Sequence, residues 1–597
     1  MAEALSGWKR TCLCTQLSES DVNKEVTLMG WAQRRRDLGS LIFVDLRDRS
    51  GIMQIVFDSS TSKDVFEKAE KIRNEYVLAI KGTVVLRDTE TINENISTGK
   101  IEIKVKELKI LAESKTPPFA IEDGTTVQDT VRLKYRYLDL RRPVMQKNLM
   151  MRHKISAITR EFLNSEGFLE LETPILGKST PEGARDYLVP SRIHPGEFYA
   201  LPQSPQQFKQ IFMISGMDRY YQIARCFRDE DLRADRQPEF TQIDMEMSFV
   251  EQDDVMDVSE RMIAKIFKET IGVDVKLPLK RMKYDEAMDR FGSDKPDTRF
   301  GLELKNISDI VANSDFSVFK GAIEKGGSVR AVNAKGCADI LSRRDIDALV
   351  DFVKIYKAKG MAWITITEEG LKSPITKFLS EEETAKIIER LEGKVGDILF
   401  FIADREDIVF DSLGHLRLKL GEKLGLIDDS VYNFLFVTEF PLFEYDYETK
   451  TYSPKHHPFT SPRDEDLDIV ESDPGKAYAK AYDMVLNGME IGGGSIRIHS
   501  VETQQRMFRV LGHSDEAIKE RFGFLIDAFD FGAPPHGGIA FGLDRVAMII
   551  TGNKSIRDVI AFPKVQNASC LMTEAPSTVD QEQLDELSIK IVEKKEK

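Results

Sequence analysis

The alternation of apolar and polar residues is clearest in residues 225–248, where two strand-like runs flank a charged loop. In the second run, Phe240, Asp244 and Glu246 share one face of a strand, and Ile243 lies on the other. The first half of the stretch holds four arginines and four acidic residues. The pattern predicts a β-hairpin with one apolar face and one face of arginine, carboxylate and aromatic groups. Such a face suits an anionic, aromatic ligand, although charged sheet faces are usually just solvated.

Shorter strand-like runs fill residues 24–112. Alternation is clear at 42–47 and again at 101–106, and the sequence 48–51 is typical of a turn. Residues 62–73 have the composition of a helix. Strands wrapped around one short helix predict a small β-barrel, for which an OB-fold is the preferred interpretation.

The predicted secondary structure changes several times along the rest of the chain. A helix with an apolar stripe is expected after residue 143 and should end at Gly167. Strands with polar alternation are expected from there to about residue 285, and mixed helices and strands after residue 299 indicate an inserted domain. The predicted organisation is a multidomain α+β protein with a barrel at 1–116, a hinge at 117–142, a larger domain in two parts at 143–298 and 429–563, an inserted α+β domain at 299–428 and a C-terminal extension at 564–597.

The composition narrows the class of protein. The chain has 597 residues, of which 41% are hydrophobic and 31% charged, as in ordinary folded proteins. Its net charge of −15 argues against a general nucleic-acid binder, but it permits one basic face. The five cysteines form no zinc-ligand pattern or disulfide framework, which fits a reducing cytosol. We expect a cytoplasmic protein, because neither a signal peptide nor a membrane span is recognisable.

Two carboxylates accompany a glycine-rich strand near residue 490. Glu490 precedes Gly492–Gly494, and Asp483 lies seven residues before Glu490. Glycines let the backbone approach a ligand closely, and Mg²⁺ prefers oxygen ligands. The residues therefore indicate a Mg²⁺ site, while a bulge or tight turn explains the glycines equally well. Arg497 follows on the same strand, on the face of Ser495.

A nucleotide, if one binds, is expected on a sheet rather than in a phosphate loop. Residues 537–545 resemble a strand that runs into a helix, with Arg545 in its first turn, where a guanidinium can clamp a phosphate. Neither a Walker sequence nor a dinucleotide fingerprint is present. Near the N-terminus, Arg34–Arg36 precede the strand with Phe43, a combination that fits single-stranded nucleic acid as well as a solvated loop.

Together these segments resemble the class II aminoacyl-tRNA synthetases, and among them the bacterial aspartyl type, over essentially the whole chain. Residues 167–176 resemble the family's motif 1, residues 227–244 motif 2 and residues 542–545 motif 3. The resemblance implies an OB-fold anticodon-binding domain, a catalytic domain with a central antiparallel sheet, and a homodimer formed through motif 1. It also implies ATP, Mg²⁺, L-aspartate and tRNA-Asp as substrates and partners.

The resemblance also implies roles for individual residues. Arg228 and Arg545 are the implied catalytic residues, Arg228 on the α-phosphate of ATP and Arg545 on the far side of the nucleotide. The implied ATP-binding residues are Arg228, Asp229, Glu230, Gln237, Phe240, Glu490, Gly542, Leu543, Asp544 and Arg545. The implied aspartate-binding residues are Glu182, Gln206, Lys209, Arg228, Asp244, His456 and Arg497. The implied Mg²⁺ ligands are Asp483 and Glu490, and the implied anticodon contacts are Arg36, Phe43 and Gln54.

The implied reaction activates aspartate as its adenylate and transfers it to tRNA, without a protein nucleophile. An alternative is an enzyme that charges both tRNA-Asp and tRNA-Asn; Leu38, where the relaxed type often has histidine, favours the strict one. A non-catalytic RNA-binding protein would leave Arg228, Glu490 and Arg545 unexplained. A paralogue that makes asparagine would lack the barrel.

Overall fold

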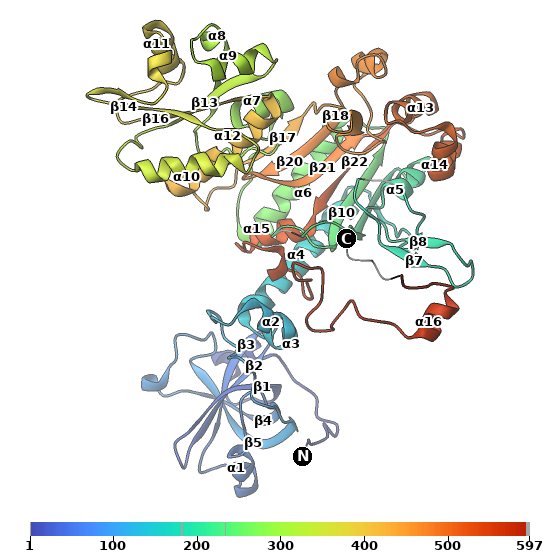
Figure 1. Ribbon diagram of the computed structural model, residues 1–597. Coiled ribbons are helices and arrows are strands. Elements are labelled where there is room, and N and C mark those ends of the chain that lie inside the picture. The colour runs from blue at the N-terminus through green and yellow to red at the C-terminus, as the bar shows by residue number, and fades with distance from the viewer. Residues whose placement is uncertain (1, 181–182, 233, 593–597) are drawn as a thin grey trace. The chain divides into compact units, whose positions relative to one another are not determined.

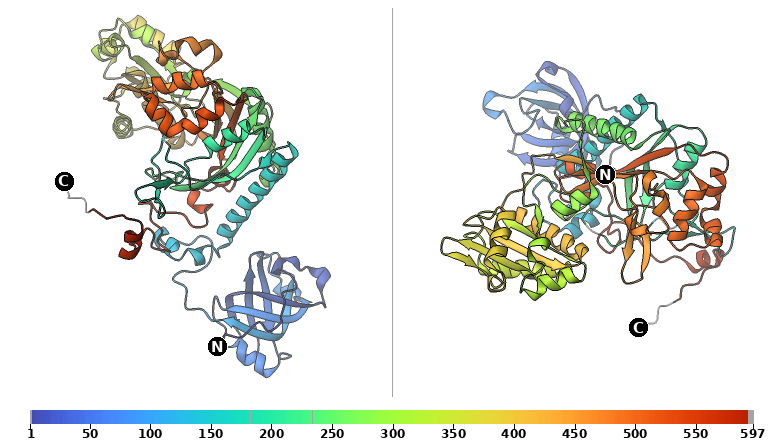
Figure 2. Two further views of the ribbon diagram at one scale, coloured as in Figure 1. Left: turned by 90° about the vertical axis from the view of Figure 1, so that its right-hand side faces the viewer. Right: turned by 90° about the horizontal axis from the view of Figure 1, so that it is seen from above.

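The computed structural model describes residues 2–180, 183–232 and 234–592, and it is shown from three sides in Figures 1 and 2. Its residues group into two compact units. The first comprises Met1–His153, Asp231–Gln237 and Thr551–Val579, and the second comprises Lys154–Glu230, Pro238–Ile550 and Asp580–Lys597. The predicted domain boundaries stay predictions.

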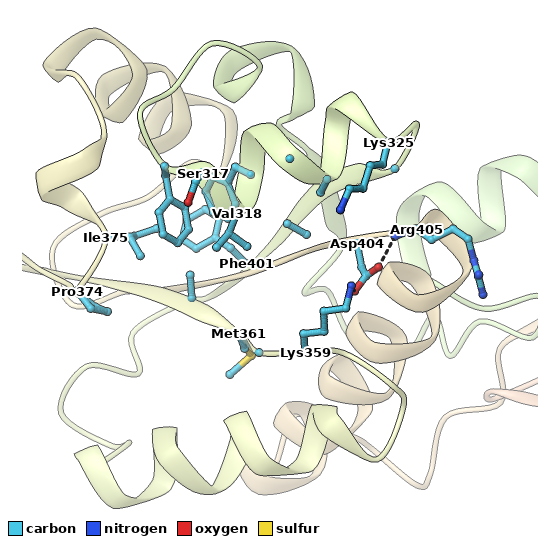
Figure 3. Close-up of a pocket in the computed structure, with 18 residues that line it drawn as sticks. Ser317, Val318, Lys325, Lys359, Met361, Pro374, Ile375, Phe401, Asp404 and Arg405 are labelled. Atoms are coloured by element: carbon cyan, nitrogen blue, oxygen red, sulfur yellow. Dashed lines mark hydrogen bonds and ion pairs between the residues drawn. The ribbon is translucent and has the colours of Figure 1, made fainter.

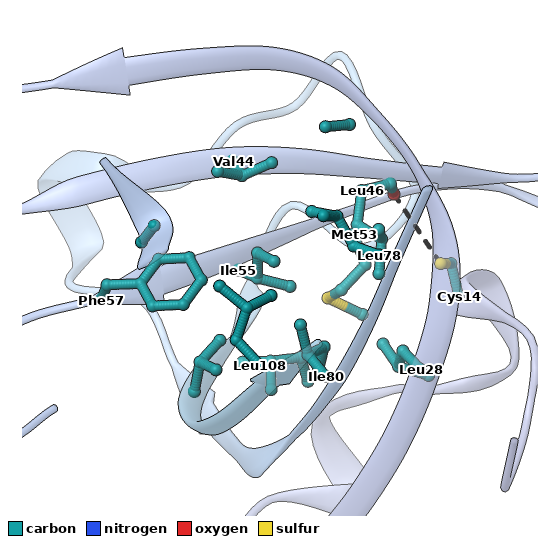
Figure 4. Packing of buried hydrophobic residues seen from close by; sticks show 14 of the residues in the cluster. Cys14, Leu28, Val44, Leu46, Met53, Ile55, Phe57, Leu78, Ile80 and Leu108 are labelled. Atoms are coloured by element: carbon teal, nitrogen blue, oxygen red, sulfur yellow. Dashed lines mark hydrogen bonds between the residues drawn. The ribbon is translucent and has the colours of Figure 1, made fainter. Parts of the chain in front are cut away.

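The first unit contains a closed five-stranded barrel with strand order β1-β2-β3-β5-β4. Its elements are β1 (Glu25–Asp37), β2 (Ile42–Asp48), β3 (Gly51–Phe57), α1 (Lys63–Ala69), β4 (Val77–Leu86) and β5 (Ile101–Ala112). The alternation at residues 42–47 predicts a strand of this barrel. The structure agrees, because the alternating residues Ile42, Val44 and Leu46 are fully buried. Figure 4 shows the side chains of Val44, Ile55 and Leu78 among those that pack inside it.

Short helices occupy the predicted hinge. They are α2 (Asp129–Lys134) and α3 (Arg136–Asp139). Within the first unit, Arg141 of the hinge donates to Glu75 of the barrel over 2.8 Å and lies over the ring of Trp31. Glu75 also accepts from the buried Arg47 over 2.7 Å, so the alternation in β2 stops at Arg47 because that side chain has a buried ionic partner.

Helix α4 (Pro143–Ser165) follows the hinge. Its predicted apolar stripe is buried at Ile155, Ile158 and Phe162. Gly167 has a φ of +81° two residues after the helix ends, a conformation that glycine adopts without strain.

The centre of the second unit is an eight-stranded sheet of order β11-β17-β20-β21-β22-β10-β9-β6. Its strands are β6 (Leu169–Glu170), β9 (Arg219–Phe227), β10 (Glu239–Ser248), β11 (Lys280–Lys283), β17 (Phe434–Thr438), β20 (Ala481–Leu486), β21 (Met489–Ile496) and β22 (His536–Gly542). The six inner strands are antiparallel, as expected, and one parallel strand at each edge makes the sheet mixed. Figure 1 shows β10, β22, β21 and β20 side by side.

Five helices accompany this sheet. They are α5 (Gln206–Ile214), α6 (Gln252–Ile271), α13 (Val501–Val510), α14 (Asp515–Phe529) and α15 (Leu543–Ile550). The expectation of strands up to residue 285 is wrong at α5 and α6. In α6, buried residues such as Val255, Met262 and Phe267 recur with helical spacing, and Gly272 in the left-handed region ends the helix.

A second, five-stranded sheet of order β12-β13-β16-β14-β15 is inserted into the unit. Its strands are β12 (Leu304–Asn306), β13 (Ser328–Ala334), β14 (Ala362–Thr367), β15 (Gly370–Lys372) and β16 (Ile398–Asp404), and the helices around it are α7 (Tyr284–Phe291), α8 (Ser308–Val311), α9 (Ser317–Glu324), α10 (Arg343–Lys354), α11 (Glu381–Arg390) and α12 (Glu406–Lys423). Both faces of β16 are apolar: Phe400 packs with α10 and α12, and Phe401 packs with α8, α9 and α11.

Two small hairpins and a short helix lie outside the barrel and the two large sheets. They are the hairpins β7 (Leu188–Pro190) with β8 (Phe198–Ala200) and β18 (Phe443–Asp446) with β19 (Thr451–Pro454), and helix α16 (Gln581–Glu586). Among the described residues, no helix is long and apolar enough to cross a membrane.

Candidate active site

A cavity of about 340 Å³ in the second unit is lined by residues of α5, β10, β20, β21 and the segment 455–457. It gathers residues that lie far apart in the sequence, such as Gln206 and Arg497, which are separated by 291 positions. The predicted site residues that line it are Gln206, Lys209, Arg228, Asp244, His456, Asp483, Glu490 and Arg497. The resemblance thus pointed to side chains that the fold brings to one place.

Sheet register and helix spacing place these side chains. Asp244 and Glu246 lie on one face of β10, and the central β22 pairs with that strand so that Glu246 is opposite Gly538. A Cβ atom at Gly538 would lie 2.1 Å from Oε2 of Glu246, so only glycine leaves room for the carboxylate. Helix α5 packs against β10 and presents the buried Gln206 and Lys209 from its first turn.

Four buried charges form a connected cluster behind the cavity. Nζ of Lys209 lies 2.6 Å from Oδ1 of Asp244 and 3.2 Å from Oε2 of Glu246. Arg497 donates two hydrogen bonds to the same Glu246, of 2.8 and 3.0 Å. Lys209 and Arg497 are each only 2% exposed. Glu246 therefore holds two cations side by side in a place that water hardly reaches.

Burial and neighbouring charges set the protonation of the two carboxylates. Burial alone would raise the pKa of Glu246, but the charges of Arg497 and Lys209 outweigh it and lower this pKa to about 2. For Asp244, burial is the stronger influence and raises the pKa even though Lys209 is adjacent. Oδ2 of Asp244 has no hydrogen-bond partner among the described residues, so it has an acceptor left for a ligand cation.

The two histidines of the segment 455–457 have different partners. Nε2 of His457 lies 2.8 Å from the Arg497 guanidinium, and burial together with that charge lowers the pKa of His457 well below 6.5. Nε2 of the ring accepts from Arg497, while Nδ1 lies 3.2 Å from the backbone nitrogen of Phe459 and 3.4 Å from Oγ1 of Thr460. The predicted His456 instead lies 3.2 Å from Oδ1 of Asp483.

Asp483 and Glu490 converge on Gly493. A Cβ atom at that glycine would lie 3.0 Å from Oδ1 of Asp483 and 3.3 Å from Oε1 of Glu490. Burial, and then the charge of Asp483, raise the pKa of Glu490, which indicates that the pair has too little positive charge around it. In the described ranges no group of three or more His, Cys, Asp or Glu side chains could hold a metal. Two carboxylates fit Mg²⁺ that keeps waters and substrate phosphates as its other ligands.

The residues predicted to bind the nucleotide at β10 lie close together. The guanidinium of Arg228 lies 5.1 Å from the ring centroid of Phe240, and Nε of Arg228 is buried without a hydrogen-bond partner in the part of the chain that the structure describes. The strand β22 runs into α15 as expected, and Arg545 in its first turn donates to the backbone oxygen of Glu490. Motif 3 is thus joined directly to the strand with the glycines.

Other predicted residues have structural partners. Oδ2 of Asp544 accepts from the backbone N–H of Thr241 over 2.8 Å, which ties α15 to β10, and Gly542 and Leu543 form the strand–helix junction. Asp229 lies 3.3 Å from Arg185, and Glu230 follows it. Gln237 belongs to the first unit and exchanges two hydrogen bonds with the backbone of Lys564. Glu182 lies outside the described residues. The proposed roles of these residues stay predictions.

The three predicted anticodon residues meet on the barrel of the first unit. Arg36 donates to Oε1 of Gln54 over 2.7 Å, and its guanidinium lies 5.5 Å from the ring centroid of Phe43. Gln54 in turn donates to Glu102 over 2.8 Å. Arg36 is about half exposed, so a charge and an aromatic ring lie together at this surface.

Sequence reasoning missed two residues that organise the cavity. The alternation places Glu246 on the polar face of its strand, and the signal for its role is its position two residues after Asp244. His457 had no role, because the sequence does not tell which ring of a His-His pair turns towards Arg497.

Comparisons with known proteins agree with this architecture. The family model for class II tRNA synthetases (D, K and N) matches residues 128–566, and that for the OB-fold nucleic acid binding domain matches residues 26–111. The aspartate–tRNA(Asp/Asn) ligase of Thermoanaerobacter sp. (strain X514) is 64% identical over 99% of this chain and 100% of its own length. The aspartate–tRNA ligase of Ruminiclostridium cellulolyticum is 59% identical over the same shares.

A solved structure has the same fold. It is that of the asparaginyl-tRNA synthetase from Pyrococcus horikoshii complexed with asparaginyl-adenylate, with a TM-score of 0.58, 18% identity and coverage of 93% of this chain and 98% of that one. The family models and the full-length relatives show that the chain belongs to the class II tRNA synthetases of the D, K and N group.

Proposed function

We propose that the chain is an aspartate–tRNA ligase, which couples ATP cleavage to the attachment of L-aspartate to tRNA-Asp. The observation that carries the proposal is the buried pair Lys209 and Arg497 at one cavity, held together by Glu246. The names of relatives at 59 to 64% identity over nearly the whole chain support it.

The cavity complements the charges of aspartate. The side-chain carboxylate of the substrate accepts from Arg497 and Lys209, and its ammonium group binds the free oxygen of Asp244. Asparagine presents a neutral amide to the same cations and adds no negative charge to those of Glu246 and Asp244. Sites built on such polar pairs reject analogues by roughly 10⁴-fold.

The first step joins aspartate to ATP. An oxygen of the α-carboxylate attacks the α-phosphorus in line, the bond to the bridging oxygen breaks, and pyrophosphate leaves with that electron pair. Arg228 stabilises the charge on the α-phosphate oxygens, Phe240 stacks on adenine and Arg545 covers the nucleotide. Asp483 and Glu490 would hold Mg²⁺, which would neutralise phosphate charge.

The second step transfers the aspartyl group. A ribose hydroxyl at the 3′ end of tRNA attacks the carbonyl carbon of the adenylate, loses its proton and expels AMP. Arg36, Phe43 and Gln54 contact the anticodon bases at the barrel, where stacking and a positive charge favour single-stranded RNA.

A homodimer formed through motif 1 is part of the proposal. In the single chain, three large apolar side chains of this segment, Leu169, Ile175 and Leu176, are about half exposed, which supports a partner surface. The cytoplasmic location stays a prediction. Sedimentation of the purified protein at about 136 kDa, twice the chain mass of 67.9 kDa, would support the dimer, and sedimentation as a monomer would contradict it.

The test of the proposed function is the charging of purified tRNA-Asp and tRNA-Asn transcripts with radiolabelled aspartate. We expect charging of tRNA-Asp in an ATP-dependent reaction. Charging of both transcripts would favour the alternative, a ligase for both tRNAs, which the name of the Thermoanaerobacter relative supports. Charging of neither would contradict the proposal.

A further inference from the structure

The inserted domain contains a cavity of about 660 Å³ that has no part in the activity proposed above. Figure 3 shows it between α9, the start of β14, the segment around Ile375 and the end of β16. Its volume lies within the range of small-molecule sites.

The floor and the rim of this cavity differ in chemistry. Phe401, Met361 and Ile375 form a buried apolar floor. Val318 is 54% exposed at the rim, where apolar side chains meet charged ones. A ligand that reaches the floor must therefore have an apolar body.

The charged side chains at the rim include one positive charge without an acidic partner among the described residues. The lining cations are Lys325, Lys359 and Arg405. Nζ of Lys359 lies 3.5 Å from Asp404, and Arg405 forms two short hydrogen bonds with Asp407. Lys325 has no ion pair within the described ranges, and in Figure 3 its side chain points from the end of α9 towards the space among the other lining residues. The surplus favours a ligand with a single negative charge.

A glycine keeps the cavity open. Gly321 lies in the middle of α9, lines the cavity and has a helical backbone. A Cβ atom there would meet nothing within 4 Å. Glycine is the poorest helix former after proline, and no close neighbour requires it at this position. A side chain at residue 321 would project into the empty space.

We propose that this cavity binds a small amphipathic monoanion, with an aromatic or branched apolar body on the floor and its anionic group near Lys325. A nucleoside triphosphate carries too much negative charge for the rim. RNA is disfavoured because the floor aromatic Phe401 is buried, whereas stacking on RNA bases needs exposed rings. The proposal does not rest on the proposed function.

The test uses two fluorescent dyes and the full-length protein. The dyes are 1-anilinonaphthalene-8-sulfonate, a monoanion, and N-phenyl-1-naphthylamine, its neutral counterpart. We expect the wild-type protein to bind the anionic dye with saturation at one site. The variant Gly321→Leu fills the cavity while favouring the helix, and we expect both dyes to bind it at least about tenfold more weakly.

Two matched controls make the result specific. Gly523→Leu makes the same change in α14, away from the cavity, and should leave dye binding unchanged. Lys325→Gln should weaken the anionic dye about two- to fivefold and leave the neutral dye unchanged, because an exposed charge contributes modestly. Lys320→Gln, in α9 five residues before Lys325 but outside the cavity lining, should change the binding of neither dye.

Three results would overturn the proposal. They are no saturable binding of the anionic dye, equal binding by wild type and Gly321→Leu, and an equal effect of Lys325→Gln on both dyes. The melting temperature of each variant shows whether it is folded. If Gly321→Leu fails to fold, the comparison of Lys325→Gln with Lys320→Gln decides.

Discussion

Glu246 is bound to both cations of the candidate active-site cavity, Lys209 and Arg497, and faces a glycine that leaves room for it. A carboxylate so placed fixes Arg497 by two hydrogen bonds and leaves the remaining guanidinium N–H groups to other acceptors. Ser495 and His457 accept from one of its nitrogens, over 2.6 and 2.8 Å. These contacts therefore orient the guanidinium that we propose to select the substrate.

We predict that Glu246→Gln destabilises the protein at pH 7 by about 3–5 kcal/mol, because it leaves two buried cations without their common counter-charge. Unfolding followed by circular dichroism, compared with the exposed Glu251→Gln as control, measures the effect. A change equal to that of the control would contradict the central place given to Glu246.

The low pKa of Glu246 gives a second expectation, on acid stability. The pKa falls from 4.5 to about 2 on folding, so the carboxylate stabilises the fold above pH 4.5 and loses its contribution as the pH falls towards 2. The shift corresponds to about 3 kcal/mol. The melting temperature of the wild type should therefore approach that of Glu246→Gln between pH 4.5 and 2. A constant gap between the two across this range would show that the carboxylate is not responsible.

At the level of single residues, the sequence predicts which chemical groups lie on a face better than it predicts which side chains contact each other. Alternation placed Asp244 and Glu246 on one face because the geometry of a strand dictates it. The choice between His456 and His457 depends on how a loop outside the strands turns, and on which ring meets Arg497. The local sequence pattern therefore does not predict which of the two histidines contacts Arg497.

Among the elements, β21 combines a metal-binding candidate with tight packing in neighbouring glycines. At Gly493 an added Cβ atom would meet the tips of Asp483 and Glu490, whereas at Gly494 it would lie 2.3 Å from the backbone oxygen of Gly538. The tips of side chains can move, but the backbone of β22 cannot do so without breaking the ladder.

We predict opposite outcomes for the two alanine variants. Gly493→Ala should fold with a melting temperature near that of the wild type and should need a higher Mg²⁺ concentration for aspartate-dependent ATP–pyrophosphate exchange, because the methyl group crowds the two carboxylates. Gly494→Ala should lower the melting temperature strongly. Thermal denaturation and exchange assays at several Mg²⁺ concentrations measure both. Similar melting temperatures for the two variants would contradict this reading of β21.

The elements predicted best were those with a strict period. The barrel strands and α4 followed their apolar patterns, whereas α5 and α6 were mistaken for strands. In α5 the buried residues include Gln206, Lys209 and Gln210, which are polar, so the helical period of burial is hidden in a hydrophobicity pattern. The candidate site contains these buried polar residues, so the hydrophobic pattern does not predict the helix that lines it.

In the whole molecule, amino-acid selection and anticodon contact are assigned to different compact units. The cavity residues belong to the second unit, and Arg36, Phe43 and Gln54 belong to the first. The net charge of −15 is compatible with RNA binding if the positive surface is local. The family resemblance predicts this division, whereas the net charge alone argues against a general nucleic-acid binder.

We predict that Phe43→Ala separates the two activities. Loss of one stacked base should weaken tRNA-Asp binding by about 1–3 kcal/mol and leave ATP–pyrophosphate exchange unchanged. Filter binding should also show that the affinity of the wild type for tRNA falls as salt rises. Phe57→Ala is unsuitable as a control because Phe57 is a core residue; the exposed Phe378→Ala in the inserted domain is suitable. An equal loss of exchange and binding in Phe43→Ala would contradict the division.

The proposed function depends on the selection of a carboxylate by Lys209 and Arg497. ATP–pyrophosphate exchange with aspartate and with asparagine, in the wild type and in Arg497→Lys, tests it directly. We predict a kcat/KM for aspartate roughly 10⁴-fold above that for asparagine, and a loss of at least about tenfold for aspartate in Arg497→Lys, because lysine cannot bind Glu246 and a second carboxylate through a planar fork. Equal exchange with both amino acids, or an unchanged kcat/KM in Arg497→Lys, would contradict the account.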